Sequence, residues 1–457
     1  MPRELRTVLL AAATALAFAD SSIVVLGLPE ILADFEAKIG GVAWVVTAYN
    51  VAVAALALAI GDWVRRLGPA RLAALGLVVF LAGSIGCAVA GSLTPLIVLR
   101  VVQGAGAALL LASSLPALSA ATGSAARGVR VWALASTVGV AVGPAAGGIL
   151  TELFDWRAIF AAQAPVALLA LLALRGLPAP PPPAPRQGPT RALDRLRANL
   201  SLAFVSAGLV GVLFLAVVLL VDVWRRSPLA AALVVTVLPV AALVAPRLVR
   251  GVHERVATAS GAVLLAGGLA ALALVPGTSL GWAIPALLLC GIGFGSAVPA
   301  LTERALIHPR DIVSAGAATV AARHAGLVLG LVVVTPLLAG DVTRSETRAT
   351  LLGVGLVLDA PLPVSQKVPL ALDLHRTLRL APDGRIPDFA PAFDKAAGRA
   401  DSPALQQLHR DFDRATTAPI ARAFRPSFTA AALLALGALL PLGLGLAPRR
   451  TRGRAAA

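Results

Sequence analysis

The chain has 457 residues, of which 58% are hydrophobic and only 14% are charged. Soluble globular proteins contain about 45–50% apolar and about 25% charged residues. A soluble core cannot accommodate this apolar excess, so the composition excludes a water-soluble enzyme and predicts a membrane protein. The formal net charge of +16 does not indicate a nucleic-acid-binding protein, because basic residues in membrane proteins mark cytoplasmic loops.

Twelve stretches are long and apolar enough to cross a bilayer, which requires about 20 residues in a helix. They are residues 7–29, 42–60, 71–91, 95–118, 130–151, 158–175, 199–221, 229–247, 257–276, 281–305, 312–340 and 427–447. The first stretch also resembles a secretory signal, with Arg3 and Arg6 before an apolar run that contains Ala17-Phe18-Ala19. The run resumes after Asp20, which favours a membrane span.

Basic residues predict the orientation of these spans. If the N-terminus is inside, arginines concentrate in the short inner segments. The short outer loops then hold only Lys38, Arg157, Arg225 and Arg226. This asymmetry fits the positive-inside rule with both termini cytoplasmic. We therefore expect a multi-pass protein of a bacterial cytoplasmic (inner) membrane.

Two hydrophilic segments divide the chain. Residues 176–198 contain the run Pro180-Pro181-Pro182-Pro183, and polyproline is stiff and extended, which predicts a cytoplasmic linker. Residues 341–426 lie outside the membrane by parity, and amphipathic stretches in them predict a partly helical extracytoplasmic cap, with a disordered loop as the alternative. The expected units are an N-terminal six-helix bundle (1–175), the linker (176–198), helices 7–11 of a C-terminal bundle (199–340), the cap (341–426), and helix 12 with a basic cytoplasmic tail (427–457).

Several ionisable residues fall within or at the ends of the apolar spans. A charged side chain at the centre of a bilayer costs roughly 3 kcal/mol or more, so each should face a partner or a cavity. The candidates for proton coupling are Asp20, Arg100, Glu303 and Asp222. The candidates for a polar central cavity are Tyr49, Asn50, Gln103, Gln163, Arg323 and His324. The alternative is that these groups form ion pairs and interhelical hydrogen bonds that only fix helix packing, and Glu303 could pair with Arg304 at the surface.

Small residues recur four positions apart in the fifth span, in the string Gly139-Val140-Ala141-Val142-Gly143-Pro144-Ala145-Ala146-Gly147-Gly148. A face of small residues lets helix backbones approach closely. Pro144 removes one amide donor and can bend the helix. The string therefore predicts a helix that packs tightly against a neighbour and can flex.

Four strings together resemble the drug:proton antiporters of the major facilitator superfamily. They are the first-span run from Asp20 to Pro29, Trp44 with Tyr49 in the second span, Leu99-Arg100-Val101-Val102-Gln103-Gly104-Ala105-Gly106 in the fourth, and the glycine string of the fifth. The resemblance implies a major facilitator fold, in which two six-helix bundles surround a cavity at the bilayer midplane and open alternately to each side. It also implies proton-driven export of small amphipathic or hydrophobic compounds.

One string departs from the family pattern, which reads G-x-x-x-D-R-x-G-R-R after the second span. Here the glycines are Gly61 and Gly68, Arg65 stands where the family has its aspartate, and Asp62 lies three residues earlier. In the family that aspartate helps to hold the cytoplasmic ends of the two halves together. This departure puts the same contact in question here.

The expected partners are the lipid bilayer, protons and a small amphipathic or lipid substrate. A carboxylic acid such as Asp20 that is removed from water is easier to protonate, which gives a means of proton coupling. The cysteines, Cys87 and Cys290, and the scattered histidines offer no metal site, and no cofactor is expected. The alternatives are an exporter of lipids or cell-envelope precursors that uses residues 341–426, and a membrane scaffold that binds a periplasmic or cell-envelope partner there. No catalytic motif supports an enzyme.

Overall fold

The computed structural model describes the chain except for residues 179–188, 276–278, 307–311, 381–388, 400–401 and 444–457. In the described residues every regular element is a helix. Twelve segments among them are long and apolar enough to cross a membrane, which confirms the expected number of spans.

The first six spans are formed by α1 to α7. Their bounds are α1 Arg3–Asp34, α2 Ile39–Leu67, α3 Pro69–Ala88, α4 Leu93–Thr122, α5 Ala125–Leu153, α6 Arg157–Ala161 and α7 Gln163–Leu174, the last two sharing one span. Ala17, Phe18 and Ala19, the site of the signal-like string, are buried in the middle of α1.

The other six spans are formed by α8 to α12 and by α16 with α17. Their bounds are α8 Pro189–Val218 with the π-helix η1 Leu219–Val223, α9 Pro228–Leu248, α10 Glu254–Ala273, α11 Leu280–Leu306, α12 Ile312–Asp359, α16 Arg425–Gly437 and α17 Leu439–Gly443. Because α8 begins at Pro189, residues 189–198 are helical, whereas the sequence predicts them to be linker. Residues 444–457, which include most of the expected basic tail, lie outside the described residues.

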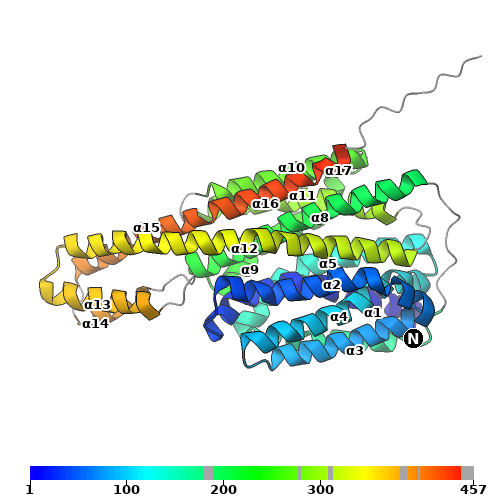
Figure 1. Ribbon diagram of the computed structural model, residues 1–457, viewed down its shortest axis with the longest axis horizontal. Coiled ribbons are helices and arrows are strands. Elements are labelled where there is room, and N and C mark those ends of the chain that lie inside the picture. The colour runs from blue at the N-terminus through cyan, green and yellow to red at the C-terminus, as the bar shows by residue number, and fades with distance from the viewer. Residues whose placement is uncertain (179–188, 276–278, 307–311, 381–388, 400–401, 444–457) are drawn as a thin grey trace, which may run out of the picture.

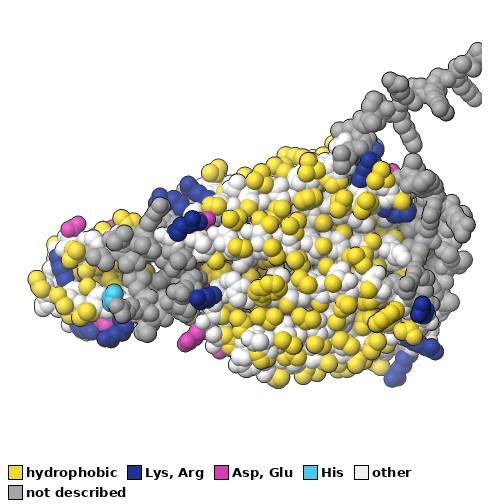
Figure 2. Space-filling model, in the orientation of Figure 1, with side chains coloured by type: hydrophobic (Ala, Val, Ile, Leu, Met, Phe, Trp, Pro, Cys, Tyr) yellow, Lys and Arg dark blue, Asp and Glu magenta, His cyan; other side chains and the backbone are white. Residues whose placement is uncertain are grey.

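The two sets of six spans, here called the first half and the second half, pack side by side with their helices nearly parallel (Figure 1). Two pairs of helices form the main seams between the halves, α2 with α12 and α5 with α9. Figure 2 shows hydrophobic side chains over the outer face of this bundle, with basic side chains gathered near its two ends. This distribution matches a bilayer flanked by two aqueous surfaces.

Glycines in α5 permit its close approach to two neighbours. A side chain at Gly139, Gly143 or Gly147 would collide with α1, at Ala15, Ser22 and Ile23 respectively. The next glycine, Gly148, faces the other half, where a side chain would collide with Ala232 of α9. The glycine string therefore joins α5 to α1 within the first half and to α9 across a seam.

A small helical unit, here called the cap, projects from the end of the bundle opposite the N-terminus (Figure 1). It contains the end of α12 beyond Val342, followed by α13 Val364–Leu380, α14 Ala390–Arg399 and α15 Pro403–Ala423. Helix α12 runs without interruption from the bundle into the cap over 48 residues. The apolar residues of α12 to α15 form a separate hydrophobic cluster there.

Aromatic rings hold the centre of the cap together. The ring of Phe412 lies 5.1 Å from those of both Phe389 and Phe393. At the surface, Asp373 accepts a hydrogen bond of 2.9 Å from Lys395 Nζ and one of 3.2 Å from Arg399. The hydrogen bond from Lys395 lowers the pKa of Asp373 below its ordinary value of 3.8. This contact therefore stabilises the cap above that pH, and its contribution is lost as the pH falls further.

We expect Phe412→Ala to unfold the cap while the membrane helices stay folded. Truncating a buried phenylalanine costs about 3–5 kcal/mol, which is a large share of the stability available to so small a core. Hydrogen exchange of the protein in lipid nanodiscs, read by mass spectrometry, should show faster exchange in α13 to α15. Leu372→Ala is the matched control, because Leu372 is exposed on α13. Unchanged exchange in the Phe412→Ala cap would contradict this account of its core.

Candidate functional site

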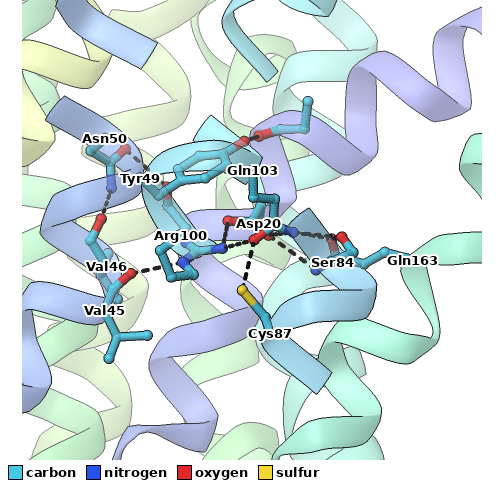
Figure 3. A network of polar contacts seen from close by, with 12 residues as sticks. Asp20, Val45, Val46, Tyr49, Asn50, Ser84, Cys87, Arg100, Gln103 and Gln163 are labelled. Carbon is cyan, nitrogen blue, oxygen red and sulfur yellow. Dashed lines mark hydrogen bonds and ion pairs between the residues drawn. The ribbon is translucent and has the colours of Figure 1, made fainter. Parts of the chain in front are cut away.

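A buried ion pair occupies the interior of the first half. The carboxylate Oδ2 of Asp20 on α1 lies 2.6 Å from Nη1 of Arg100 on α4, and both side chains are inaccessible to solvent. The same Nη1 donates a 2.6 Å hydrogen bond to Oε1 of Gln103, one turn further along α4. Both charges are therefore compensated in a region where an unpaired charge is costly (Figure 3).

Two glutamines and a serine complete the surroundings of the carboxylate. Oδ1 of Asp20 accepts hydrogen bonds from Nε2 of Gln103 at 3.2 Å and from Nε2 of Gln163 at 3.0 Å. Ser84 of α3 accepts from Gln103 Nε2 at 2.7 Å and donates to Gln163 Oε1 at 3.1 Å. The side chains come from α1, α3, α4 and α7, so the network connects four helices of the first half (Figure 3).

The guanidinium of Arg100 is held on its other sides as well. Its Nε donates a 2.7 Å hydrogen bond to the carbonyl of Val45. Its plane lies over the ring of Tyr49, 4.4 Å from the centroid, and 5.6 Å from that of Phe160. Tyr49 is positioned in turn by a 2.8 Å hydrogen bond from its hydroxyl to the carbonyl of Ala17 on α1. These contacts leave Arg100 little freedom while Asp20 is ionised.

A second polar contact crosses from the first half to the second. Nδ1 of His324 on α12 lies 2.7 Å from Oδ1 of Asn50 on α2. Asn50 donates from Nδ2 to the carbonyl of Val46, so its Oδ1 is the acceptor that faces His324. The same Oδ1 accepts a 2.9 Å hydrogen bond from Ser21, the residue after Asp20. A chain of contacts therefore leads from α1, beside the ion pair, to the other half.

Arg323, the neighbour of His324, also meets the first half. Its guanidinium lies over the ring of Phe18 of α1, 4.5 Å from the centroid. Arg323 and Phe18 line a small cavity between the halves, with a volume of about 30 Å³. A cavity of this volume holds about one or two water molecules, whereas a typical ligand site has a volume of roughly 300–1,000 Å³. The halves are thus closed around this position.

The remaining candidates lie away from this centre. Glu303 is exposed near the end of α11, and its neighbour Arg304 pairs with Glu254 and Asp194. Asp222 is partly exposed in η1. The backbone of Gly61, Asp62 and Arg65 belongs to α2, and the side chains of Asp62 and Arg65 lie outside the described residues. Gly68 ends α2 with a φ of 83°, a left-handed conformation that suits glycine.

Sequence reasoning missed three residues of this centre. Ser84 connects the glutamines, Ser21 leads to Asn50, and Phe18 lies under Arg323. A signal for Ser84 was present, because it is a hydroxyl in an otherwise apolar stretch of α3. The chemistry of the centre is that of a single carboxylate that can gain or lose a proton beside a fixed cation. No cluster of potential metal ligands occurs in the described part of the chain.

Comparison with known proteins agrees with this architecture. Over 152 residues, the chain is 35% identical to the riboflavin transporter RibZ of Clostridioides difficile (strain 630), an alignment that covers 33% of each protein. It is 34% identical over 155 residues to the multidrug resistance protein Stp of Mycobacterium tuberculosis (strain CDC 1551 / Oshkosh), covering 33% of this chain and 29% of Stp. The matched segment thus spans only about a third of these relatives.

Similarity to solved structures covers the whole fold. A bacterial homologue of the human lysosomal transporter Spinster, in an inward-facing and occupied conformation, superposes with a TM-score of 0.67 at 17% identity. The superposition covers 96% of this chain and 97% of the other. The sequence model of one family, described as the Major Facilitator Superfamily, matches residues 10–339. With its twelve spans in two packed halves, the chain belongs to the Major Facilitator Superfamily.

Proposed function

We propose that the protein is a proton-coupled secondary transporter that exports small amphipathic or hydrophobic compounds by alternating access. The observation that carries this proposal is the Asp20–Arg100 pair, buried in the first half beside residues that reach the other half. Resistance and efflux names among the partial relatives, such as the multidrug resistance protein Stp, support export. The riboflavin transporter RibZ shows that the same partial similarity extends to other cargo.

The proposed coupling step is protonation of Asp20. A neutral Asp20 no longer compensates the charge of Arg100, and the energy of their contact is lost. Arg100 then shifts or takes other acceptors, and Tyr49, Gln103 and the α1 segment around Ser21 are free to reorganise. Because Ser21 and His324 share the acceptor Asn50, such a change reaches the contact between the halves.

We place the protein in a bacterial cytoplasmic membrane with both termini in the cytoplasm, and the cap on the outer surface. The concentration of arginines in the inner segments supports this orientation. In this orientation α5 and α9 close the outer end of the cavity, since Gly148 meets Ala232 and the carboxylate of Glu152 accepts a 3.1 Å hydrogen bond from the amide of Leu229. Export requires these contacts to open.

The cap favours a second candidate function, the export of lipids or cell-envelope precursors. Its separate hydrophobic cluster and its continuity with α12 place an ordered unit beyond the bundle. A unit at this position can receive an apolar product or dock a partner of the envelope. Loss of release after deletion of the cap, with the twelve spans still folded, is the result that distinguishes this function from drug export.

We expect Asp20→Asn to abolish transport driven by a pH gradient while the protein remains folded. Asparagine keeps the shape of the side chain and can still accept from Gln103 and Gln163, but it cannot carry a proton through the cycle. The assay is uptake of dyes and lipids into inside-out proteoliposomes with and without a pH gradient. Glu36→Gln is the control, because it removes an exposed carboxylate just beyond the end of α1. Accumulation by Asp20→Asn at the wild-type level would remove Asp20 from the mechanism.

The energetic coupling of the pair can be measured separately from transport. We expect Arg100→Gln to destabilise the protein by about 3–5 kcal/mol, because it leaves the buried charge of Asp20 unpaired. The double variant Asp20→Asn with Arg100→Gln should recover much of that loss, since neither side chain is then charged. Thermal unfolding of the four proteins in one detergent gives the coupling energy. Additive effects would mean that the two charges do not compensate each other.

Gly148→Leu should separate α5 from α9 at the end of the bundle near the cap. The new side chain has no space, since Ala232 and the carbonyl of Pro228 already contact this glycine. Spin labels at exposed Leu153 and Leu233 should report a longer distance, and transport should fall by at least tenfold. Gly267→Leu is the matched control, because no atom lies within 4 Å of the position of its β-carbon. An unchanged distance with full transport would show that this seam does not move in the cycle.

A further inference from the structure

Arg323 is a second buried cation, and its surroundings differ from those of Arg100. Its side chain is 5% exposed, and Nη1 is buried with no hydrogen-bond partner. Within the described residues, its guanidinium contacts the ring of Phe18. Arg100, in contrast, has the carboxylate of Asp20, the amide of Gln103 and the carbonyl of Val45.

The charge of Arg323 requires compensation. Arginine does not lose its proton inside proteins, so a buried arginine stays cationic. A ring face supplies only part of the stabilisation that a carboxylate gives. The carboxylate of Asp20 does not compensate Arg323, because it is already bound by Arg100, Gln103 and Gln163. No acidic residue is among those lining the cavity next to Arg323.

The cavity itself has the composition of a site for an amphipathic anion. Its apolar wall combines Phe18 and Val140 of the first half with Leu209, Leu213 and Leu327 of the second. Ser21, Ser22 and Ser206 line it beside Arg323 and His324. The Nε2 atom of His324 is buried and also has no hydrogen-bond partner. Because Nδ1 of His324 donates to Asn50, its Nε2 is an acceptor, and the unpaired donor beside this apolar space is Nη1 of Arg323.

We propose that Arg323 binds the anionic group of the transported compound, so that the substrates are amphipathic organic anions such as aromatic or aliphatic carboxylates. This inference rests on the proposed transport function and names its substrate class. The anion supplies the charge that the protein lacks at this position, and the apolar wall takes the body of the molecule.

The site must enlarge before it can hold such a molecule, and its construction allows this. Because the walls come from both halves, separating them widens the space without unfolding either half. Arg323 lies on α12, which forms one of the two main seams. The contact of Arg323 with Phe18 of α1 crosses from one half to the other, so separating the halves frees the guanidinium to bind the substrate.

The test compares three probes with one apolar body and different charge: 1-pyrenebutyrate, its primary amide, and 1-pyrenebutylamine. Binding to the full-length protein in lipid nanodiscs is measured from the shift of its thermal unfolding midpoint with probe concentration, corrected with empty nanodiscs. The wild type should bind the carboxylate at least tenfold more tightly than the amide, and the amine most weakly. Equal binding of carboxylate and amide by the wild type would overturn the proposal.

Variants at Arg323 identify the residue responsible. Arg323→Gln should bind carboxylate and amide equally, and Arg323→Lys should keep part of the preference because it keeps a cation without the planar fork. Arg250→Gln, which removes an exposed arginine in the loop after α9, should retain the wild-type preference. An Arg323→Gln protein that still prefers the carboxylate tenfold would overturn the assignment.

Stability without a probe gives a readout that does not depend on ligand binding. Removing an uncompensated buried charge should leave the unfolding midpoint of Arg323→Gln equal to or above that of the wild type. A midpoint lower by more than 5 °C would mean that Arg323 has a structural partner and would count against the proposal. Arg323→Lys, which keeps the charge, provides the binding comparison in that event.

Asp20→Asn separates this inference from the proposed function. It should keep the preference for the carboxylate, because Arg323 is intact, while losing transport driven by a pH gradient. If the wild type prefers the carboxylate probe but a pH gradient does not drive its transport, proton coupling is refuted and the inference about Arg323 stands. Proton-driven transport of the amine or amide with no anion preference would refute the inference alone.

Discussion

The low dielectric interior of a membrane bundle allows a charge only where another charge or a set of hydrogen bonds compensates it, and the contact between Asp20 and Arg100 satisfies this condition. Most of the polar architecture of the first half follows from it. Gln103 and Gln163 direct their amides to the carboxylate, and Ser84 aligns both glutamines. Because Arg100 also contacts Gln103 and Tyr49, the charge of Asp20 bears on residues beyond the pair itself.

Close helix packing makes that network possible. Lipid provides no hydrophobic force between helices, so association depends on backbones that approach closely and on interhelical hydrogen bonds. Gly139, Gly143 and Gly147 bring α5 against α1, the helix that carries Asp20. Gly148, the next residue, points about 100° away around the helix and meets α9 of the other half. One string of small residues therefore supports both the helix of the ion pair and a seam between the halves, which explains why its spacing was informative in the sequence.

The sequence was sufficient for features that depend on local composition. Apolar length predicted twelve spans, and the strings around Asp20, Arg100 and Gly143 predicted the family. It could not predict contacts that depend on how the halves meet, such as that of His324 with Asn50 or of Arg323 with Phe18, because nothing in the local pattern relates α12 to α1 and α2. It also did not predict that the helix of span 7 begins before its apolar stretch, at Pro189, where the missing amide of proline costs nothing.

Helix α12 relates the cavity to the cap. Arg323 and His324 lie near its beginning, and Val357, buried in the core of the cap, lies near its end. At 1.5 Å per residue, the 34 residues from Arg323 to Val357 span about 51 Å along one continuous helix. A continuous helix transmits tilt rather than absorbing it, with Pro336 as the one internal proline where it can bend. A rotation of α12 about its seam with α2 therefore also displaces the cap unless the helix bends at Pro336, and this proline sets how far the cap follows the contacts that close the cavity around Arg323.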